Sequence, residues 1–197
     1  NRTVPFPSRP ADLYKSKVVG ELVKEFGYKN RMAVPRLEKI VVSMGVGKAA
    51  QDKKYIELAK ADLTLITGQM PFVCKAKKSV SNFKVREGQE TGLKVTIRGE
   101  RMYEFMDRLI SLAIPRVRDF RGLKRSGFDG RGAYSMGLSE QTVFPEINAV
   151  KVEFQQGMNI TFVTTARSDD EARRMLALFG MPFKALKTDS KSKDDQD

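Results

Sequence analysis

Three polar residues with regular spacing are the first candidates for chemistry in this chain. Lys94, Thr96 and Arg98 alternate with apolar residues along the stretch 93–98. Successive side chains of a β-strand point to opposite faces, so two cations and a hydroxyl lie on one face and the apolar residues on the other. The stretch predicts a strand that packs with one side and presents positive charge with the other.

An aromatic residue lies nearby in the sequence. Phe83 stands among serines and basic residues in the stretch 79–86, which also predicts a strand. An exposed aromatic side chain can stack on a base or a ribose, and it contributes about 1–3 kcal/mol per stacked base. A core position for Phe83 is the alternative that the pattern leaves open.

The positive charge of the chain is concentrated in its middle. The 197 residues carry a formal net charge of +12, and the stretch 71–131 has 15 Lys and Arg against 7 Asp and Glu, a net of +8. Positive potential attracts polyanions, so nucleic acid or an anionic membrane is the expected partner. RNA is favoured because a flat basic sheet suits its shallow grooves and loops, and no stretch predicts a major-groove recognition helix. A cluster such as Lys75, Lys77 and Lys78 can equally be a solvated face.

Residue types that most enzymes need are missing. The chain has no histidine and a single cysteine, Cys74. This removes the usual general base near neutral pH, the Ser–His and Cys–His nucleophile pairs, an internal disulfide and a zinc site of ordinary ligand count. The acidic run 169–171 is expected to open a helix rather than form a site. We therefore expect no enzyme activity, no metal and no cofactor.

Residues 45–50 (GVGKAA) imitate a nucleotide-binding motif. They follow a predicted strand and precede a predicted helix, as in the dinucleotide fingerprint GxGxxA. No acidic residue ends a second parallel strand about 20 residues later. Ala49 also stands where a phosphate-binding loop needs Ser or Thr for magnesium. A nucleotide-dependent enzyme is therefore a weak alternative.

Hydrophobic periodicity predicts the order of the elements. Helices are expected at 11–26, 52–67 and 101–113 and after the capping residue Ser168, whose partner is Glu171. Strands are expected at 39–46, 79–86, 93–98, 150–154 and 158–165. Pro115 is expected to stop the third helix, and the glycine-rich stretch 119–139 is expected to be a long functional loop.

These elements predict an α+β fold, an antiparallel β-sheet with helices packed on one face and the other face free. One domain is expected at 11–184, with an extended or disordered arm at 1–10 and a disordered polar tail at 185–197. No apolar run reaches the roughly 20 residues that cross a bilayer, and no leader is recognisable, so a cytoplasmic protein is expected.

Several motifs occur in this chain in the order that is typical of one family. They are KIVVSMGVG (39–47), KAKKSVSNFKVR (75–86), KVTIRGERM (94–102), PRVRDFRG (115–122), FDGRGAYSMG (128–137) and the stretch 164–183. Over about residues 11–184 the chain resembles the bacterial form of the ribosomal protein L-five family, a universal component of the large subunit.

The resemblance implies a structural protein of the central protuberance that is bound to the ribosome and grips 5S rRNA with the exposed sheet face. The family's contact positions correspond to Ser43, Gln69, Phe83, Thr96 and Arg98, and the predicted rRNA-binding set also includes Lys75, Lys77, Lys78 and Lys94. The family usually has asparagine at the position of Ser43. Serine offers one hydroxyl in place of the separate donor and acceptor of an amide.

The resemblance implies two further contacts. The hairpin tip at 84–92 would reach peptidyl-site tRNA through Lys84, Arg86 and Gln89. A mobile loop at 121–136 would meet a small-subunit head protein across an intersubunit bridge, through Arg121, Lys124, Arg125 and Arg131. The expected partners are thus 5S rRNA, large-subunit rRNA, tRNA and that protein, with no membrane and no small-molecule substrate. A stand-alone RNA-binding regulator with the same sheet face is the alternative.

Overall fold

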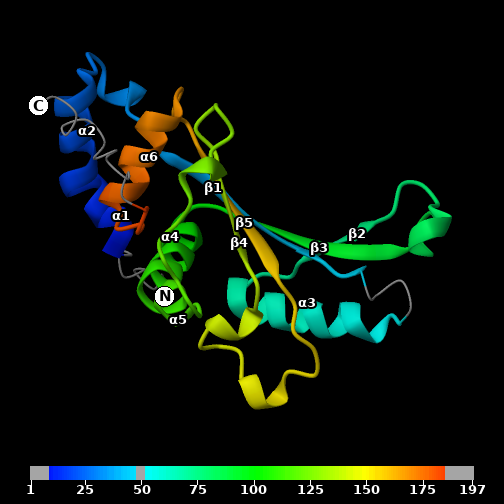
Figure 1. Ribbon diagram of the computed structural model, residues 1–197. Coiled ribbons are helices and arrows are strands. Elements are labelled where there is room, and N and C mark those ends of the chain that lie inside the picture. Colours follow the sequence, from blue (N-terminus) through cyan, green and yellow to red (C-terminus); the bar gives the residue numbers. More distant parts are fainter. Residues whose placement is uncertain (1–8, 48–51, 185–197) are drawn as a thin grey trace, which may run out of the picture.

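Five strands form one sheet in the order β2-β3-β1-β5-β4, and every pair of neighbours is antiparallel (Figure 1). The computed structural model describes residues 9–47 and 52–184. The strands are β1 (Leu37–Gly45), β2 (Phe72–Lys75), β3 (Glu90–Ile97), β4 (Tyr134–Leu138) and β5 (Met158–Thr164). The predicted α+β class with an antiparallel sheet is confirmed.

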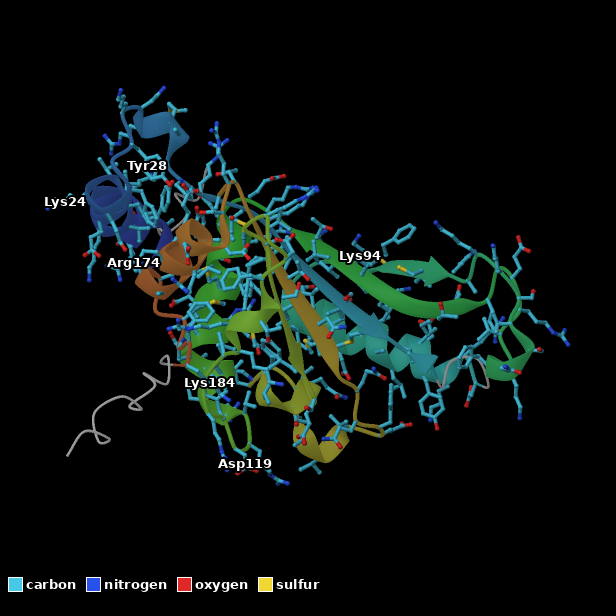
Figure 2. All side chains as sticks on the ribbon, turned by 45° about the horizontal axis from the view of Figure 1, so that its top comes forward. Lys24, Tyr28, Lys94, Asp119, Arg174 and Lys184 are labelled. Atoms are coloured by element: carbon cyan, nitrogen blue, oxygen red, sulfur yellow. The ribbon has the colours of Figure 1, made fainter. Side chains whose placement is uncertain are left out.

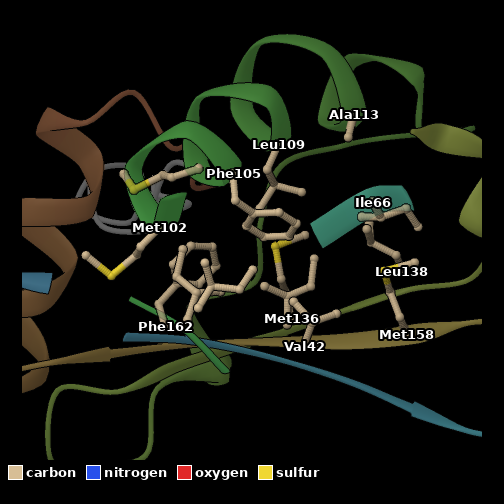
Figure 3. Packing of buried hydrophobic residues seen from close by; sticks show 14 of the residues in the cluster. Val42, Ile66, Met102, Phe105, Leu109, Ala113, Met136, Leu138, Met158 and Phe162 are labelled. Carbon is tan, nitrogen blue, oxygen red and sulfur yellow. The ribbon is translucent and has the colours of Figure 1, made fainter. Parts of the chain in front are cut away.

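One face of the sheet is apolar and covered. Ile97, Ile40, Phe162 and Tyr134 are paired in sequence across four strands, and each is at most 1% exposed. The next row, Val95, Val42, Ile160 and Met136, is buried in the same way. Figure 3 shows Phe105 and Leu109 above Met136 and Phe162, so the core lies between this face and the helices.

The helices lie against the apolar face and at one end of the sheet. They are α1 (Arg9–Leu13), α2 (Val19–Phe26), α3 (Lys54–Thr67), α4 (Glu100–Arg108), α5 (Ile114–Arg116) and α6 (Asp169–Leu178). α3 packs on β3, α1 on α4 and α2 on α6. π-helical turns, Tyr14–Val18 and Leu109–Ala113, join α1 to α2 and α4 to α5. No helix within residues 9–47 and 52–184 is long and apolar enough to cross a membrane.

Local signals predicted several elements correctly. The apolar spacing of Ile56, Ala59, Leu63 and Ile66 gives α3, which ends at Gly68 with φ +66°. The strands expected at 39–46, 93–98 and 158–165 are β1, β3 and β5. Ser168 caps α6 through its hydroxyl, which accepts the amide of Glu171, as expected.

The strand predicted at 79–86 is wrong. The strand that pairs with β3 is β2, at Phe72–Lys75, and the chain reverses within the stretch that had been expected to be extended. Val80 and Val85 pair across a short 3-10 turn, and Lys84 adopts φ +53°. The two valines imitate strand alternation, although they face each other across the turn.

Two expectations in the C-terminal half are also wrong. The stretch 119–139 is not entirely a loop, because β4 occupies Tyr134–Leu138 and alternates buried and exposed residues. The stretch 150–154 is not a strand. Its backbone is held by the buried side chain of Gln141, which donates to the carbonyl of Phe154 at 2.8 Å and accepts from the amide of Gln156 at 2.6 Å. β5 therefore does not form the expected hairpin with 150–154. It pairs with β1, which is distant in the sequence, and with β4, from which a long connection separates it.

Two helix boundaries differ from the prediction. The first helix begins at Arg9, two residues before the expected start, so the arm expected at 1–10 is helical in its last two residues, and 1–8 lie outside the described residues. Pro115 does not stop the third helix, because α5 continues to Arg116. The preceding π-helical turn widens the chain ahead of the ring, which relieves the clash that a proline makes in a regular helix.

The packing of Phe105 between α4 and the sheet predicts a large effect on stability. Phe105 is fully buried and stacks near Phe144, with ring centroids 6.0 Å apart. Phe105→Ala should lower the free energy of unfolding by about 3–5 kcal/mol, because it leaves a cavity between α4 and the sheet. Chemical denaturation followed by circular dichroism measures this. The matched control is Leu112→Ala on the same helical run, where the side chain is 46% exposed and the change should be small. Equal losses in both variants would contradict the assignment of the core.

Candidate nucleic-acid interface

The second face of the sheet carries rows of mostly polar residues that none of the helices within residues 9–47 and 52–184 covers (Figure 1). The first row runs across all five strands and consists of Phe72, Lys94, Ser43, Asn159 and Gly137. The second consists of Thr96, Val41, Thr161 and Ser135. We call the two rows together the open face. Every one of its side chains is exposed or partly exposed, and neither row contains an acidic residue.

The open face presents a cation and several hydroxyl and amide groups. Lys94 is exposed and lies opposite Ser43, which in turn lies opposite Asn159. The hydroxyls of Thr161 and Ser135 are hydrogen-bonded at 2.9 Å, which orders the second row. Such groups match phosphate, ribose hydroxyls and base edges, which accept and donate hydrogen bonds.

The structure brings four of the predicted rRNA-binding residues together. Ser43, Lys94 and Thr96 belong to the open face, and exposed Arg98 directly follows β3 at one end of it. Gln69 lies in the connection between α3 and β2, where its backbone bonds to the hydroxyl of Thr67. It therefore stands beside the start of the edge strand rather than on the face.

The other predicted rRNA-binding residues lie on the hairpin tip, which we define as residues 75–89. Lys75, Lys77, Lys78 and Phe83 are exposed there, and Phe83 has an exposed fraction of 76%. The sequence had suggested that Phe83 lies on a strand, but it lies in the 3-10 turn of the tip and not on the open face. The tip and Arg98 lie at opposite ends of β3, whose eight residues span about 25 Å. Figure 1 shows the tip projecting beyond α3.

The hairpin tip is closed by its own hydrogen bonds. The amide of Ala76 donates to the carbonyl of Gln89 at 2.8 Å, and the amide of Glu87 donates to the hydroxyl of Ser79 at 2.9 Å. The side-chain oxygen of Gln89 accepts the amide of Arg86 at 3.0 Å. Lys84 and Arg86 are exposed on this frame. The three residues predicted to meet tRNA are thus close together, with Gln89 in a structural role as well.

The predicted bridge residues lie along the connection from α5 to β4. Arg121, Lys124 and Arg131 are exposed, whereas Arg125 is partly buried and donates from Nε to the carbonyl of Lys184 at 3.1 Å. The hydroxyl of Tyr134 donates to the carbonyl of Lys124 at 3.0 Å, and burial raises the pKa of Tyr134 to about 12. This connection is fastened to the body at several points.

Two carboxylates hold the turn that carries Arg131. Asp129 accepts the amides of Arg131 at 2.8 Å and Ala133 at 3.0 Å. From the start of α6, Asp169 accepts the amides of Gly130 and Gly132, both at 3.0 Å. Gly132 has φ +84°, and a Cβ there would lie 2.9 Å from the carbonyl oxygen of Ala166. The close approach to Ala166, in the connection between β5 and α6, requires glycine at position 132. Exposed Arg131 extends from this turn, residues 129–133, which we call the pinned turn.

Several residues of the open face could not be predicted from the sequence, and Phe72 is the largest of them. Phe72 is 73% exposed and lies directly opposite Lys94. Because no strand was predicted at 72–75, no face could be assigned to Phe72, and only the pairing of β2 with β3 reveals it. Asn159 and Thr161 were expected on a strand, but their position beside Ser43 and Val41 is likewise a result of tertiary pairing.

The alternative of nucleotide binding finds no support in the arrangement of the strands. β1, which ends at Gly45, has antiparallel neighbours on both sides, whereas dinucleotide folds place the motif after a strand of a parallel sheet. Residues 48–51 of the motif lie outside the described residues. Within the residues that are described, no cluster of three or more acidic or cysteine side chains could hold a metal ion.

The chain is an α+β protein whose sheet presents a polar surface with basic residues. Comparison with known families places it among the ribosomal proteins. Residues 30–86 match the family model described as ribosomal protein L5, and residues 90–183 match the model of the ribosomal L5P family C-terminus. The large ribosomal subunit protein uL5 of Carboxydothermus hydrogenoformans is 55% identical over 175 residues, which are 89% of this chain and 98% of that protein.

The chain belongs to the ribosomal protein L5 family. This is a family of ribosomal structural proteins and not a class of enzymes. The two matched regions meet inside the hairpin tip, and their strands interleave in the sheet, because β1 from the first lies between β3 and β5 from the second.

The pinned turn generates a prediction about pH. The amides of Arg131 and Ala133 lower the pKa of Asp129. A carboxyl group whose pKa is lower in the folded than in the unfolded state stabilises the folded state at every pH above the unfolded pKa. This stabilisation is lost as the pH falls through the folded pKa. The amide NMR shifts of Arg131 and Ala133 should therefore titrate with a midpoint below about 3.9. Asp129→Asn should abolish the transition, and a midpoint at or above the ordinary value would contradict the assigned hydrogen bonds.

Proposed function

We propose that the chain is a structural component of the large ribosomal subunit that binds 5S rRNA with its open face. The observation that carries the proposal is the unbroken row from Lys94 through Ser43 to Asn159, polar and free of acidic residues, on a sheet whose other face is filled by the core. Membership of the L5 family and the 55% identity to a protein named for the large subunit support it.

The chain acts by prepositioning rather than by chemistry. A sheet anchored by its core holds cations and hydrogen-bonding groups at fixed spacing, so little conformational entropy is lost when RNA binds. Lys94 and Arg98 meet phosphates, and Ser43 and Thr96 meet ribose or base groups. Gln69 and Phe83 extend this contact beyond the edge of the sheet, together with Lys75, Lys77 and Lys78 on the hairpin tip.

Two further contacts belong to the same proposal. The exposed cations Lys84 and Arg86 on the hairpin tip contact the phosphates of peptidyl-site tRNA, since the tip projects far from the body (Figure 1). Arg121, Lys124, Arg125 and Arg131 contact a protein of the small-subunit head. Hydrogen bonds to Asp169 at the start of α6 and to the carbonyl of Lys184 hold their connection, which supports a contact surface of defined shape.

Removing single charges tests the open face. Arg98→Ala should weaken binding of a 5S rRNA transcript by roughly 1–3 kcal/mol. Lys94→Ala should also reduce the slope of log affinity against log salt by about 0.7–0.9, because one phosphate contact is lost. Gel-shift titrations over a range of salt concentrations measure both effects.

The matched control for this test is Lys24→Ala, which removes the same charge. Figure 2 shows Lys24 at the helical end of the molecule, well separated from Lys94 on the sheet. The control should leave affinity and slope nearly unchanged. If Lys24→Ala and Lys94→Ala lower the affinity equally, only the overall charge of the protein matters and the proposed interface is wrong. If the wild-type chain does not bind the transcript, the proposed function fails.

The pinned turn predicts an effect on subunit association. Arg131→Ala in reconstituted large subunits should weaken association with small subunits by up to about fivefold, since an exposed ion pair contributes about 0.2–1 kcal/mol. Light scattering at limiting magnesium concentration measures this. Lys24→Ala again supplies the control, and equal association in the two variants would argue against a bridge contact at this turn.

A further inference from the structure

Phe72 occupies an unusual place for a large apolar side chain. It begins β2, the edge strand of the sheet, and 73% of it is exposed. Met70, two residues earlier, is 68% exposed. Val73 between Phe72 and Cys74 pairs with buried Leu93, which shows that Phe72 points to the opposite, open side.

The neighbours of Phe72 define what it can contact. Lys94 lies directly opposite on β3, and side chains in such pairs have Cβ atoms about 5 Å apart. Ser43 and Asn159 continue the same row. An aromatic ring next to an ammonium group, a hydroxyl and an amide offers a stacking surface, a phosphate partner and hydrogen bonds to base edges within the reach of one or two nucleotides.

An apolar protein surface fits this corner less well. It would cover Phe72, but it would also remove Lys94, Ser43 and Asn159 from water without giving them partners, which is costly for polar and charged groups. A nucleotide satisfies all of them at once. The absence of acidic residues from both rows of the open face agrees with a polyanionic occupant.

We infer that Phe72 is a nucleobase-stacking residue of the 5S rRNA interface, with Lys94 holding the adjacent phosphate. The inference rests on the proposed function and deepens it, because it extends the contact to the edge strand β2. An unpaired base of 5S rRNA lies against the ring of Phe72, and the same strand of RNA crosses Lys94 toward Ser43.

Variants at position 72 test the stacking. Phe72→Ala should weaken binding of a 5S rRNA transcript by the full chain roughly 5- to 150-fold, whereas Phe72→Tyr keeps the ring and should bind nearly as the wild type does. Phe72→Leu keeps apolar area without the π-face and should fall between them. The salt dependence should be the same in all three, since no charge is removed. Val150→Ala, at a side chain 93% exposed outside the sheet, is the matched control.

The single cysteine of the chain provides a second measurement. Cys74 lies two residues from Phe72 on the same side of β2 and is partly exposed. Saturation with 5S rRNA should slow its alkylation by a maleimide at least several-fold. Thermal unfolding of each variant shows whether the fold is kept, which we expect for an exposed position.

Each outcome separates the inference from the proposed function. If the wild-type chain does not bind 5S rRNA, the proposed function fails together with the inference. If it binds, and Phe72→Ala binds equally well or Cys74 is alkylated at the same rate with RNA present, the inference is overturned while the proposed function stands. A Tyr variant as weak as the Ala variant would also overturn stacking.

Discussion

Each strand of the antiparallel sheet buries one side and leaves the other exposed, and the positions of the groups on the open face follow from this burial. Because side chains alternate along each strand, the same pairing of strands that buries Ile40 and Phe162 in the core leaves Ser43, Lys94 and Thr96 on the solvent side. A register shift of one residue would bury the cations and expose the core, so the hydrophobic packing that stabilises the fold also sets the order of groups on the open face.

The open face, the hairpin tip and the turn that carries Arg131 lie at different places on the same sheet. β3 carries Lys94 and Thr96 on the open face and continues into the hairpin tip, so the two surfaces are held by one strand. The tip keeps its shape through backbone bonds such as those between Val80 and Val85, at 2.9 and 3.2 Å, and not through a core of its own. On the other edge, β4 follows a turn that Asp129 closes from within and that Asp169 fastens to the start of α6.

Hydrogen bonds from single side chains determine the backbone conformation of the segments that are neither helix nor strand. Gln141 holds the chain at Phe154 and Gln156, and this explains why an alternating stretch there is not a strand. Asp169 holds the glycines of the turn before β4, which is why a glycine-rich stretch is ordered. In both cases a partner distant in the sequence overrides the local pattern, since buried backbone groups must be hydrogen-bonded.

The sequence alone predicts the antiparallel α+β class, α3, the cap of α6 and the polar side of β3, because these follow from periodicity, capping residues and charge within a few neighbouring residues. It could not place β2 or β4, whose four and five residues become strands only through pairing with β3 and β5. For the same reason only the tertiary structure set Phe72 beside Lys94 and moved Phe83 to the hairpin tip: cross-strand neighbours are chosen by long-range hydrogen bonding, which leaves no local trace.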